Sequence, residues 1–216
     1  MDYEIIFFDL DSTLYPEESG LWQAIGERID LYLSYKMGWS AEIIPHLRHQ
    51  LFMDYGTTLK GLQIKYDVDP FDYLEFVHDL PLEDYLKPDP SLREILLRID
   101  TRRWVFTNAD KPHSERILKT LEIQDCFEGI IDVWAMDPYV KPMKEAYEYA
   151  MEHTGISNPR KCVLIDDSSR NLDSAREMGF FTIFICENGT QKTTHRTIKT
   201  IHHLPELAGE INFSKR

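Results

Sequence analysis

Two aspartates spaced one residue apart follow a short apolar run near the start of the chain, and they are well placed to do chemistry. The run Ile5–Phe8 leads directly into Asp9, and Asp11 lies two residues further on. In an extended segment, residues two apart point the same way, so the two carboxylates can address one point. The repulsion between the two carboxylates would be offset by a divalent cation, by a proton shared between them, or by different roles for the two groups. The alternative is a turn in which Asp11, Ser12 and Thr13 cap backbone groups.

Three more groups of polar residues follow apolar runs later in the chain. They are Thr107 with Asn108, Lys141, and Asp166 with Asp167. Because the carboxyl ends of parallel strands meet at one edge of a sheet, we expect these side chains to gather there with the first two aspartates. The acids suit Mg²⁺, while the hydroxyl, amide and ammonium groups suit phosphoryl oxygens. Taken singly, each group also fits a helix N-cap or a solvated lysine.

Hydrophobic periodicity predicts the elements that position these residues. Residues 17–85 are predicted to be mostly helical, and from residue 89 onward helices alternate with short apolar strands. Strands are expected at 104–107, 130–133, 162–165 and 181–185, and a loop is expected at 188–200. This alternation indicates βαβ units and predicts an α/β fold, a Rossmann-like three-layer α/β/α core with a parallel sheet.

The helical stretch interrupts the predicted sheet after its first strand. We therefore expect two domains, a core made of residues 1–15 and 86–216 and an inserted helical cap made of residues 16–85. The insertion leaves the first strand just after Asp11, which predicts a position over the crevice at the carboxyl ends of the strands.

Composition limits the partners and the compartment. The 216 residues include 24 basic and 37 acidic side chains, for a formal net charge of -13, which argues against nonspecific binding to nucleic acid or to anionic membranes. Three separated cysteines without a CxxC pair, no signal-peptide pattern and no apolar run of transmembrane length predict a cytoplasmic protein.

The spacing of the polar motifs resembles that of haloacid dehalogenase superfamily hydrolases. The four motifs are matched by Asp9-x-Asp11-x-Thr13, by Thr107-Asn108, by Lys141-Pro142, and by Asp166-Asp167 with Asn171. The helical insertion is similar to the C1 type of cap in this family. Ser12 departs from the Asn or Gly often found at its position.

The resemblance implies a two-step phosphoryl transfer. Asp9 would be the nucleophile that forms an aspartyl-phosphate, and Asp11 would protonate the leaving alkoxide and then activate water. Thr107, Asn108 and Lys141 would bind the phosphoryl group. A dehalogenase needs no acid at the position of Asp11, so the pair favours phosphate chemistry.

The resemblance also implies a Mg²⁺ cofactor. Its ligands would be the carboxylates of Asp9 and Asp166 and the backbone carbonyl of Asp11. Asp167 would bind the ion through water or orient the ligands, and Asn171 would support them.

A narrower similarity points to the pyrimidine 5'-nucleotidase group. It lies in Tyr55–Leu62, Asp79–Leu82 and Phe106–Ala109. It implies a small phosphorylated metabolite as partner, a nucleoside 5'-monophosphate. Separately, we expect some cap residue between Leu51 and Leu62 to line the leaving-group pocket. The alternatives are a sugar-phosphate phosphatase, a phosphomutase, or a noncatalytic phospholigand-binding protein. No nucleic acid or membrane partner is expected, and the protein is expected to be a monomer or a homodimer.

Overall fold

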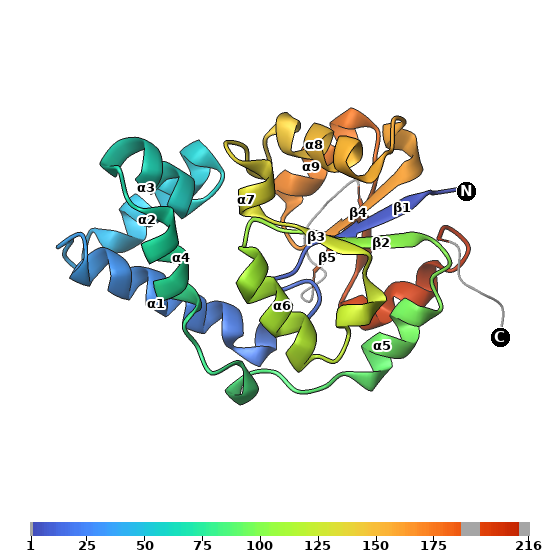
Figure 1. The fold of residues 1–216 in the computed structure, drawn as a ribbon, viewed down its shortest axis with the longest axis horizontal. Helices are drawn as coiled ribbons and strands as arrows, with labels where there is room; N and C mark the ends of the chain where they lie inside the picture. Colours follow the sequence, from blue (N-terminus) through green and yellow to red (C-terminus); the bar gives the residue numbers. More distant parts are fainter. Residues whose placement is uncertain (1, 187–194, 212–216) are drawn as a thin grey trace. The chain divides into compact units, whose positions relative to one another are not determined.

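The chain forms two compact units in the computed structural model, which describes residues 2–186 and 195–211. The core unit comprises Met1–Pro16 and Leu86–Arg216, and the helical unit comprises Glu17–Tyr85. Figure 1 shows a sheet with helices on both faces in the first unit and helices without a sheet in the second.

The core sheet has six strands, all parallel, in the order β3-β2-β1-β4-β5-β6. The strands are β1 (Ile5–Phe8), β2 (Arg102–Phe106), β3 (Gly129–Ile131), β4 (Cys162–Asp166), β5 (Phe181–Ile185) and β6 (Arg196–Ile198). The sequence-based prediction of a parallel α/β core is confirmed.

Strand β1 lies at the centre of the sheet because its four residues are apolar and suit a position covered on both sides. All four are fully buried. The ring of Phe7 contacts Phe106 and Phe180, with centroids 5.7 and 6.2 Å away, whereas Phe8 contacts Phe127 at 5.5 Å. Successive strand residues point to opposite faces, so β1 joins the cores on the two sides of the sheet.

The order of the strands reverses next to β1. The chain adds β2 and β3 on one side of β1, then returns to add β4 and β5 on the other side. Phe8 is level with Ile165 in the register between β1 and β4, and the amide of Asp9 donates to the carbonyl of Ile165 at 2.9 Å. Crevices for ligands form at such reversal points, at the carboxyl ends of the strands.

Helices cover both faces of this sheet, as Figure 1 shows. One face carries α7 (Val133–Met136), α8 (Lys144–Thr154) and α9 (Ser169–Met178), whose apolar residues share a core with Phe7 and Leu164. The other face carries α5 (Pro90–Leu97), α6 (Lys111–Thr120) and the 3₁₀ helix η5 (Ile201–Leu207). Two short 3₁₀ turns, η3 (Gln124–Cys126) and η4 (Pro159–Lys161), precede β3 and β4. The predicted three-layer α/β/α arrangement is therefore confirmed.

The helical unit contains α1 (Leu21–Tyr35), α2 (Ile44–Tyr55), α3 (Thr58–Tyr66) and α4 (Pro70–His78), flanked by η1 (Glu17–Ser19) and η2 (Leu82–Asp84). Local signals set the helix starts: Thr57 and Asp69 cap α3 and α4 through their side chains, and Pro45 lies in the first turn of α2, where proline is tolerated. Its core includes the ring of Tyr32, which packs against Tyr73 with centroids 5.0 Å apart.

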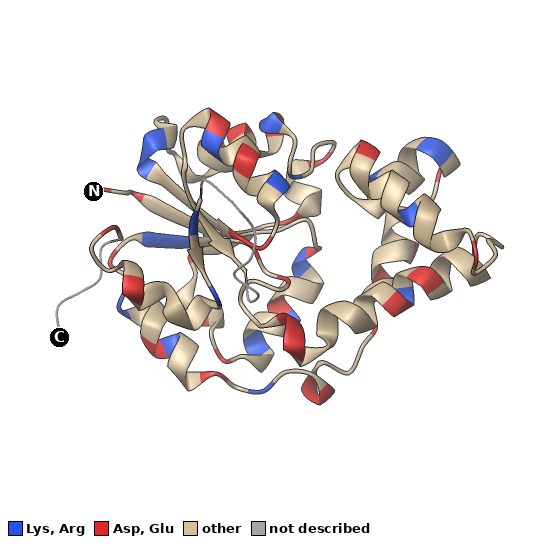
Figure 2. Cartoon of the chain, turned by 180° about the vertical axis from the view of Figure 1, so that it is seen from behind, with Lys and Arg blue, Asp and Glu red and all other residues tan. Residues whose placement is uncertain are grey.

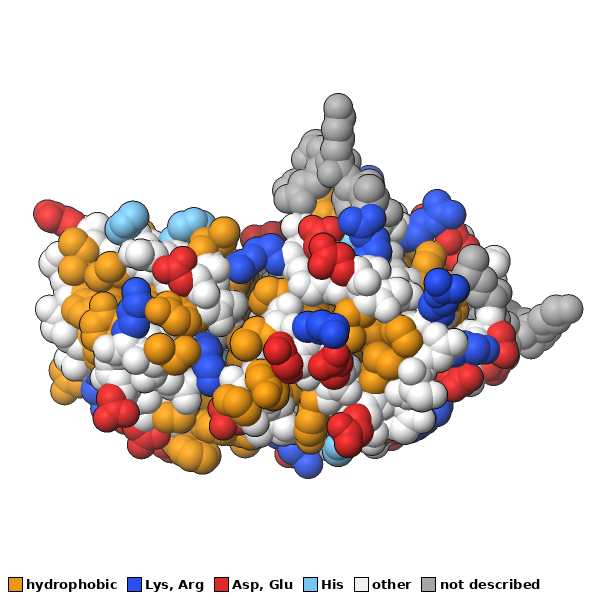
Figure 3. All heavy atoms as spheres, turned by 90° about the horizontal axis from the view of Figure 1, so that it is seen from above, with side chains coloured by type: hydrophobic (Ala, Val, Ile, Leu, Met, Phe, Trp, Pro, Cys, Tyr) orange, Lys and Arg blue, Asp and Glu red, His pale blue; other side chains and the backbone are white. Residues whose placement is uncertain are grey.

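The surfaces of the two units differ in character. Nine of the twelve large hydrophobic side chains exposed among the described residues belong to the helical unit, and Tyr35 and Phe71 are the most exposed. Figure 3 shows hydrophobic side chains, in orange, at the surface of this unit. Acidic residues lie on both units in Figure 2. Among the described residues, no helix combines the length and the apolar character needed to cross a bilayer.

Two predicted elements differ from the observed ones. The strand expected at 130–133 ends at Ile131, because Asp132 caps the short helix α7 by accepting a hydrogen bond from the amide of Ala135. The loop expected at 188–200 contains the short strand β6 at 196–198, and residues 187–194 lie outside the described part.

Candidate active site

A buried lysine joins the ends of β1 and β4. The ammonium nitrogen of Lys141 lies 2.8 Å from Asp9 Oδ1 and 2.8 Å from Asp166 Oδ2. The side chains of Lys141 and Asp166 are 1% and 0% exposed, while that of Asp9 is 12% exposed. The lysine follows α7 in sequence, so three separate parts of the core converge on one ion-pair cluster.

Carboxylates near this lysine are arranged to hold a cation. Oxygen atoms of Asp9, Asp166 and Asp167 lie within 4.8 Å of one another. The side-chain amide of Asn171 donates to both oxygens of Asp166 at 3.1 Å, and the amide of Ser168 donates to Asp166 Oδ1 at 2.8 Å. Because Mg²⁺ prefers one or two carboxylates and other oxygen ligands, this group fits the expected ion.

The electrostatics of the cluster indicate that it needs further positive charge. Burial, with the adjacent charge of Asp166, raises the pKa of Asp9 to about 7, although Lys141 opposes this shift. Burial disfavours the ammonium form of Lys141, but the charges of Asp166 and Asp9 outweigh it and raise the pKa of Lys141 above its ordinary value. The lysine thus stays charged, and a divalent cation would keep Asp9 ionised as well.

The carboxyl group of Asp11 contacts different partners from that of Asp9. The hydroxyl of Tyr15 donates to Asp11 Oδ1 at 2.6 Å, and His113 Nε2 lies 3.3 Å from the same oxygen. Both partners are almost completely buried. Burial raises the pKa of Tyr15 well above its usual range, so its hydroxyl stays protonated.

Thr107 and Asn108 follow β2 at the same edge of the sheet. Thr107 is buried, and its Oγ1 accepts a hydrogen bond from the amide of Ala109 at 3.0 Å, so the hydroxyl proton points elsewhere. The side chain of Asn108 forms two bonds with the backbone of Lys141, donating to its carbonyl at 2.9 Å and accepting from its amide at 2.8 Å. Asn108 therefore fixes the loop that carries Lys141.

Two buried hydroxyl groups beside these aspartates have no hydrogen-bond partner in the described part of the chain. They are Ser12 Oγ and Thr13 Oγ1. Ser12 also has a positive φ of 56°, a conformation that costs about 1 kcal/mol or more for a residue other than glycine. Buried polar atoms usually have partners, so these hydroxyls point to a polar ligand at this position.

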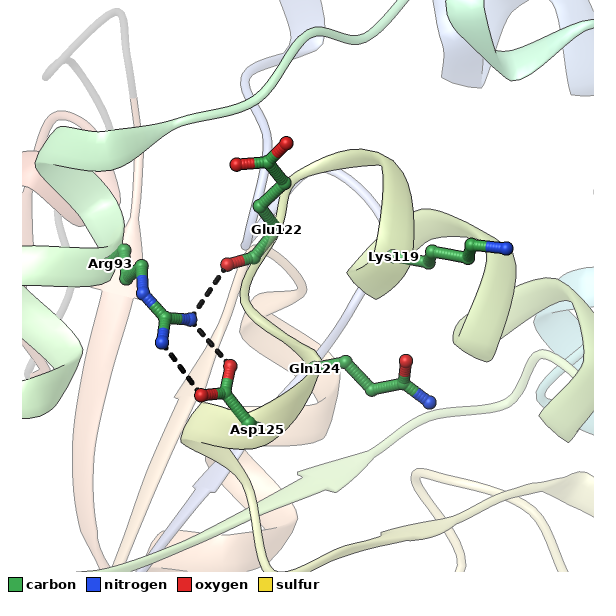
Figure 4. A pocket seen from close by; sticks show the side chains of 5 residues that line it. All are labelled: Arg93, Lys119, Glu122, Gln124 and Asp125. Carbon is green, nitrogen blue, oxygen red and sulfur yellow. Dashed lines mark hydrogen bonds and ion pairs between the residues drawn. The ribbon is translucent and has the colours of Figure 1, made fainter.

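A separate surface pocket of about 460 Å³ is lined by Arg93, Lys119, Glu122, Gln124 and Asp125. Figure 4 shows the guanidinium group of Arg93 pointing toward Asp125 and the backbone of Glu122. Its guanidinium forms a two-bond ion pair with Asp125 and donates to the carbonyl of Glu122 at 2.8 Å. This pocket contains none of the motif residues, and the arginine holds α5 to the turn after α6.

Comparison with known proteins identifies the family. Residues 3–203 match the model of the haloacid dehalogenase-like hydrolases. The chain belongs to this family. Phosphate metabolism protein 8 of Saccharomyces cerevisiae is 32% identical to this hydrolase over 190 residues, which cover 82% of the chain and 59% of the yeast protein. The chain thus spans less than two thirds of the length of this relative.

Solved structures of the family share the fold of this hydrolase. A HAD phosphatase from Thermococcus onnurineus is 22% identical, with a TM-score of 0.64 and coverage of 95% of this chain and 98% of that one. A HAD hydrolase from Bacillus subtilis, described as bound to magnesium, is 15% identical, with a TM-score of 0.65 and coverage of 97% and 100%. Structures of dehalogenases and of a β-phosphoglucomutase also match.

The geometry of the site brings most of the predicted residues of this hydrolase into one place. Asp9, Lys141 and Asp166 are bonded to one another, and Asp167 and Asn171 lie against Asp166. The sequence interpretation gave no role to two residues that the structure adds, Tyr15 and His113. The available signals were their positions, four residues after Asp11 and six residues after Thr107.

Proposed function

We propose that this hydrolase is a Mg²⁺-dependent phosphomonoesterase that acts through an aspartyl-phosphate. The observation that carries the proposal is the division of labour between two aspartates. Asp9 lies in the ion-pair and carboxylate cluster with Lys141. The carboxyl group of Asp11, at the same edge of the sheet, instead contacts the hydroxyl of Tyr15 and Nε2 of His113. A nucleophile and a separate acid are what phosphate-ester hydrolysis requires.

In the first step, a carboxylate oxygen of Asp9 attacks phosphorus and forms an acyl-phosphate bond. The bond between phosphorus and the leaving oxygen breaks, and Asp11 transfers its proton to that oxygen, so an alcohol departs. Lys141 and the hydroxyl of Thr107 offset the charge on the phosphoryl oxygens. Ser12 and Thr13 offer buried hydroxyls to the same group.

In the second step, Asp11 is ionised and accepts a proton from water. The resulting nucleophile attacks phosphorus, the bond to Asp9 breaks, and inorganic phosphate is released with Asp9 restored as a carboxylate. The proton on Asp11 is restored at the same time, so the cycle closes without another reactant.

Mg²⁺ would be held by the carboxylates of Asp9 and Asp166 and by the backbone carbonyl of Asp11, with Asp167 and Asn171 supporting the ligands. When bound, it supplies positive charge that stabilises the phosphoryl group in transfer and lowers the repulsion between an anionic substrate and the acids. The electrostatics of the aspartate cluster and the chemistry of its donors support this assignment.

We further propose a nucleoside 5'-monophosphate as substrate, with the helical unit acting as a cap that selects the leaving group. The support is the sequence similarity of residues 55–62 and 79–82 to pyrimidine 5'-nucleotidases, together with the exposed aromatic side chains of this unit. A sugar-phosphate phosphatase or phosphomutase would use the same core residues. These alternatives differ in the leaving group or in the acceptor of the phosphoryl group.

The testing experiment is phosphate release from a panel of nucleoside monophosphates and sugar phosphates, with and without Mg²⁺. We expect Mg²⁺-dependent release with a preference for UMP or CMP. Isomerisation of a sugar phosphate without net release would identify a mutase. Absence of both reactions in the folded protein would leave a phospholigand-binding protein.

Replacing the nucleophile gives the sharper test. Asp9→Asn should lower kcat by more than about a thousandfold, because an amide does not form the acyl-phosphate. The matched control is Asp100→Asn, which changes an exposed aspartate of the core unit and should leave kcat unchanged. Near wild-type turnover by a folded Asp9→Asn protein would refute Asp9 as nucleophile.

A further inference from the structure

Two buried side chains from different elements converge on one oxygen of Asp11. Tyr15 lies in the segment after β1 and His113 lies on α6, and both face Asp11 Oδ1, at 2.6 and 3.3 Å. Their side chains are shielded from water, since Tyr15 is 1% exposed and the side chain of His113 is 0% exposed. Asp11 is the residue to which the proposed function assigns both proton transfers, so a catalytic role for these two neighbours rests on that function.

The hydrogen-bond chemistry determines which oxygen of Asp11 carries the transferred proton. The phenol of Tyr15 points at Oδ1 of Asp11 and donates a hydrogen bond to it. An ionised carboxylate can only accept hydrogen bonds, so we infer that His113 carries a proton on Nε2 and donates to Oδ1 as well. Two donors directed at Oδ1 leave no room for a proton on that atom. The acidic proton of Asp11 therefore belongs on Oδ2.

We propose that Tyr15 and His113 are positioning residues for proton transfer by Asp11. They hold its carboxyl group in one rotamer and keep Oδ2 as the atom that gives the proton to the leaving oxygen and later takes one from water. Oδ1 can accept from both donors in the protonated and in the ionised form of Asp11, so neither donor has to move between the two steps. Preorganised donors of this kind avoid reorganisation during the reaction.

A comparison of two phosphate esters separates this role from a role in folding. An alkyl phosphate releases an alkoxide, which must be protonated as it departs, whereas p-nitrophenyl phosphate releases a stable phenolate that leaves unprotonated. The quantity to measure is kcat/KM at saturating Mg²⁺, because it reports the steps up to departure of the leaving group. The alkyl ester is UMP, or the alkyl phosphate of the panel that the wild type hydrolyses best.

The informative variant is Tyr15→Phe, which removes only the hydroxyl group. We expect kcat/KM for the alkyl ester to fall about tenfold and kcat/KM for p-nitrophenyl phosphate to change less than about twofold. His113→Leu should show the same selective loss, and His113→Gln, which can present an amide donor near the position of Nε2, should recover part of it. In an Asp11→Asn background, Tyr15→Phe should cause no further loss, because its effect acts through Asp11.

Two pairs elsewhere in the chain offer matched controls. Tyr32→Phe removes a buried tyrosine hydroxyl that bonds to Asp72 at 2.9 Å in the helical unit, and His195→Gln changes a buried histidine 3.3 Å from Asp173. Neither should alter the ratio of the two kcat/KM values. An equal loss on both esters in Tyr15→Phe, or a further loss in the Asp11→Asn background, would overturn the positioning role. Failure of the wild type to hydrolyse either ester would overturn the proposed function and this role with it.

Discussion

At the scale of single residues, we expect the proposed binding of Mg²⁺ to depend on pH through Asp9. The pKa of about 7 belongs to the metal-free protein, where burial and the adjacent Asp166 disfavour the ionised form. We therefore expect a proton on Asp9 to compete with Mg²⁺ below this pH. Affinity for Mg²⁺ should rise about tenfold per pH unit up to about pH 7 and level off above it.

The measurement is a calorimetric titration with Mg²⁺ at several pH values on both sides of neutrality. Asp100→Asn, the exposed control, should follow the wild-type profile. An affinity that stays constant from about pH 5.5 to about pH 7 would show that Asp9 does not gain its charge on metal binding.

Individual residues also show how far sequence reasoning reaches. Asp9 and Asp166 were predictable candidates because acids interrupt apolar runs where strands end, and such positions open to the ligand crevice. Tyr15 was not a predictable candidate, because the sequence does not distinguish an aromatic residue beside an apolar segment from a core residue. Only the structure shows that its hydroxyl has a hydrogen-bond partner. His113 faces Asp11 only through the register and placement of α6, which local sequence does not encode.

At the scale of elements, the pairing of β2 with β3 depends on a close approach of side chain to backbone. The indole of Trp104 lies over Gly129, and a Cβ built there would be 2.4 Å from an indole carbon. Gly129→Ala should therefore force the strand or the indole to shift and lower the free energy of unfolding by about 1 to 3 kcal/mol.

Denaturant unfolding of the two alanine variants would check this expectation. Gly209→Ala is the control, because a Cβ at residue 209 has no atom within 4 Å. Equal stabilities of the Gly129→Ala and Gly209→Ala variants would contradict the proposed clash.

The elements differ in how well their sequences specify them. Strands β1, β4 and β5 are short but almost wholly apolar runs with buried side chains, so their positions are predictable from the hydrophobic pattern. Strand β6 is not, because Arg196 and Thr197 are exposed on the outermost strand and only Ile198 is buried. The short helix α7 depends on one cap, Asp132, whose side chain also accepts from the amide of Lys111 at 2.8 Å.

At the scale of the whole molecule, we expect the buried acids to make stability depend on the proposed Mg²⁺. The folded-state pKa of Asp9 lies above its unfolded value, so this group makes the metal-free protein less stable as pH rises from about 4 to about 7. Mg²⁺ at a concentration of a hundred times its dissociation constant should raise the free energy of unfolding by about 2.7 kcal/mol near neutral pH. Thermal unfolding with and without Mg²⁺ measures this gain as a rise in Tm.

A matched pair of variants tests the origin of that gain. Asp166→Asn removes a proposed ligand and should abolish most of the Mg²⁺-dependent rise in Tm, whereas Asp100→Asn should retain it. A full rise in Asp166→Asn would place the stabilising metal elsewhere in the protein.

The central position of β1 has a consequence for the order in which the parts of the core are synthesised. Asp9 leaves the ribosome 132 residues before its partner Lys141, and β4 follows Lys141 in the chain. In a nascent chain that does not yet include β4, the apolar strand β1 lacks one of its two neighbouring strands. An apolar strand with an unpaired edge favours aggregation during translation. Such a chain also lacks Asp166, the second carboxylate that the ammonium group of Lys141 contacts. The cluster of Asp9, Lys141 and Asp166 therefore forms only after β4 has been synthesised and has paired with β1.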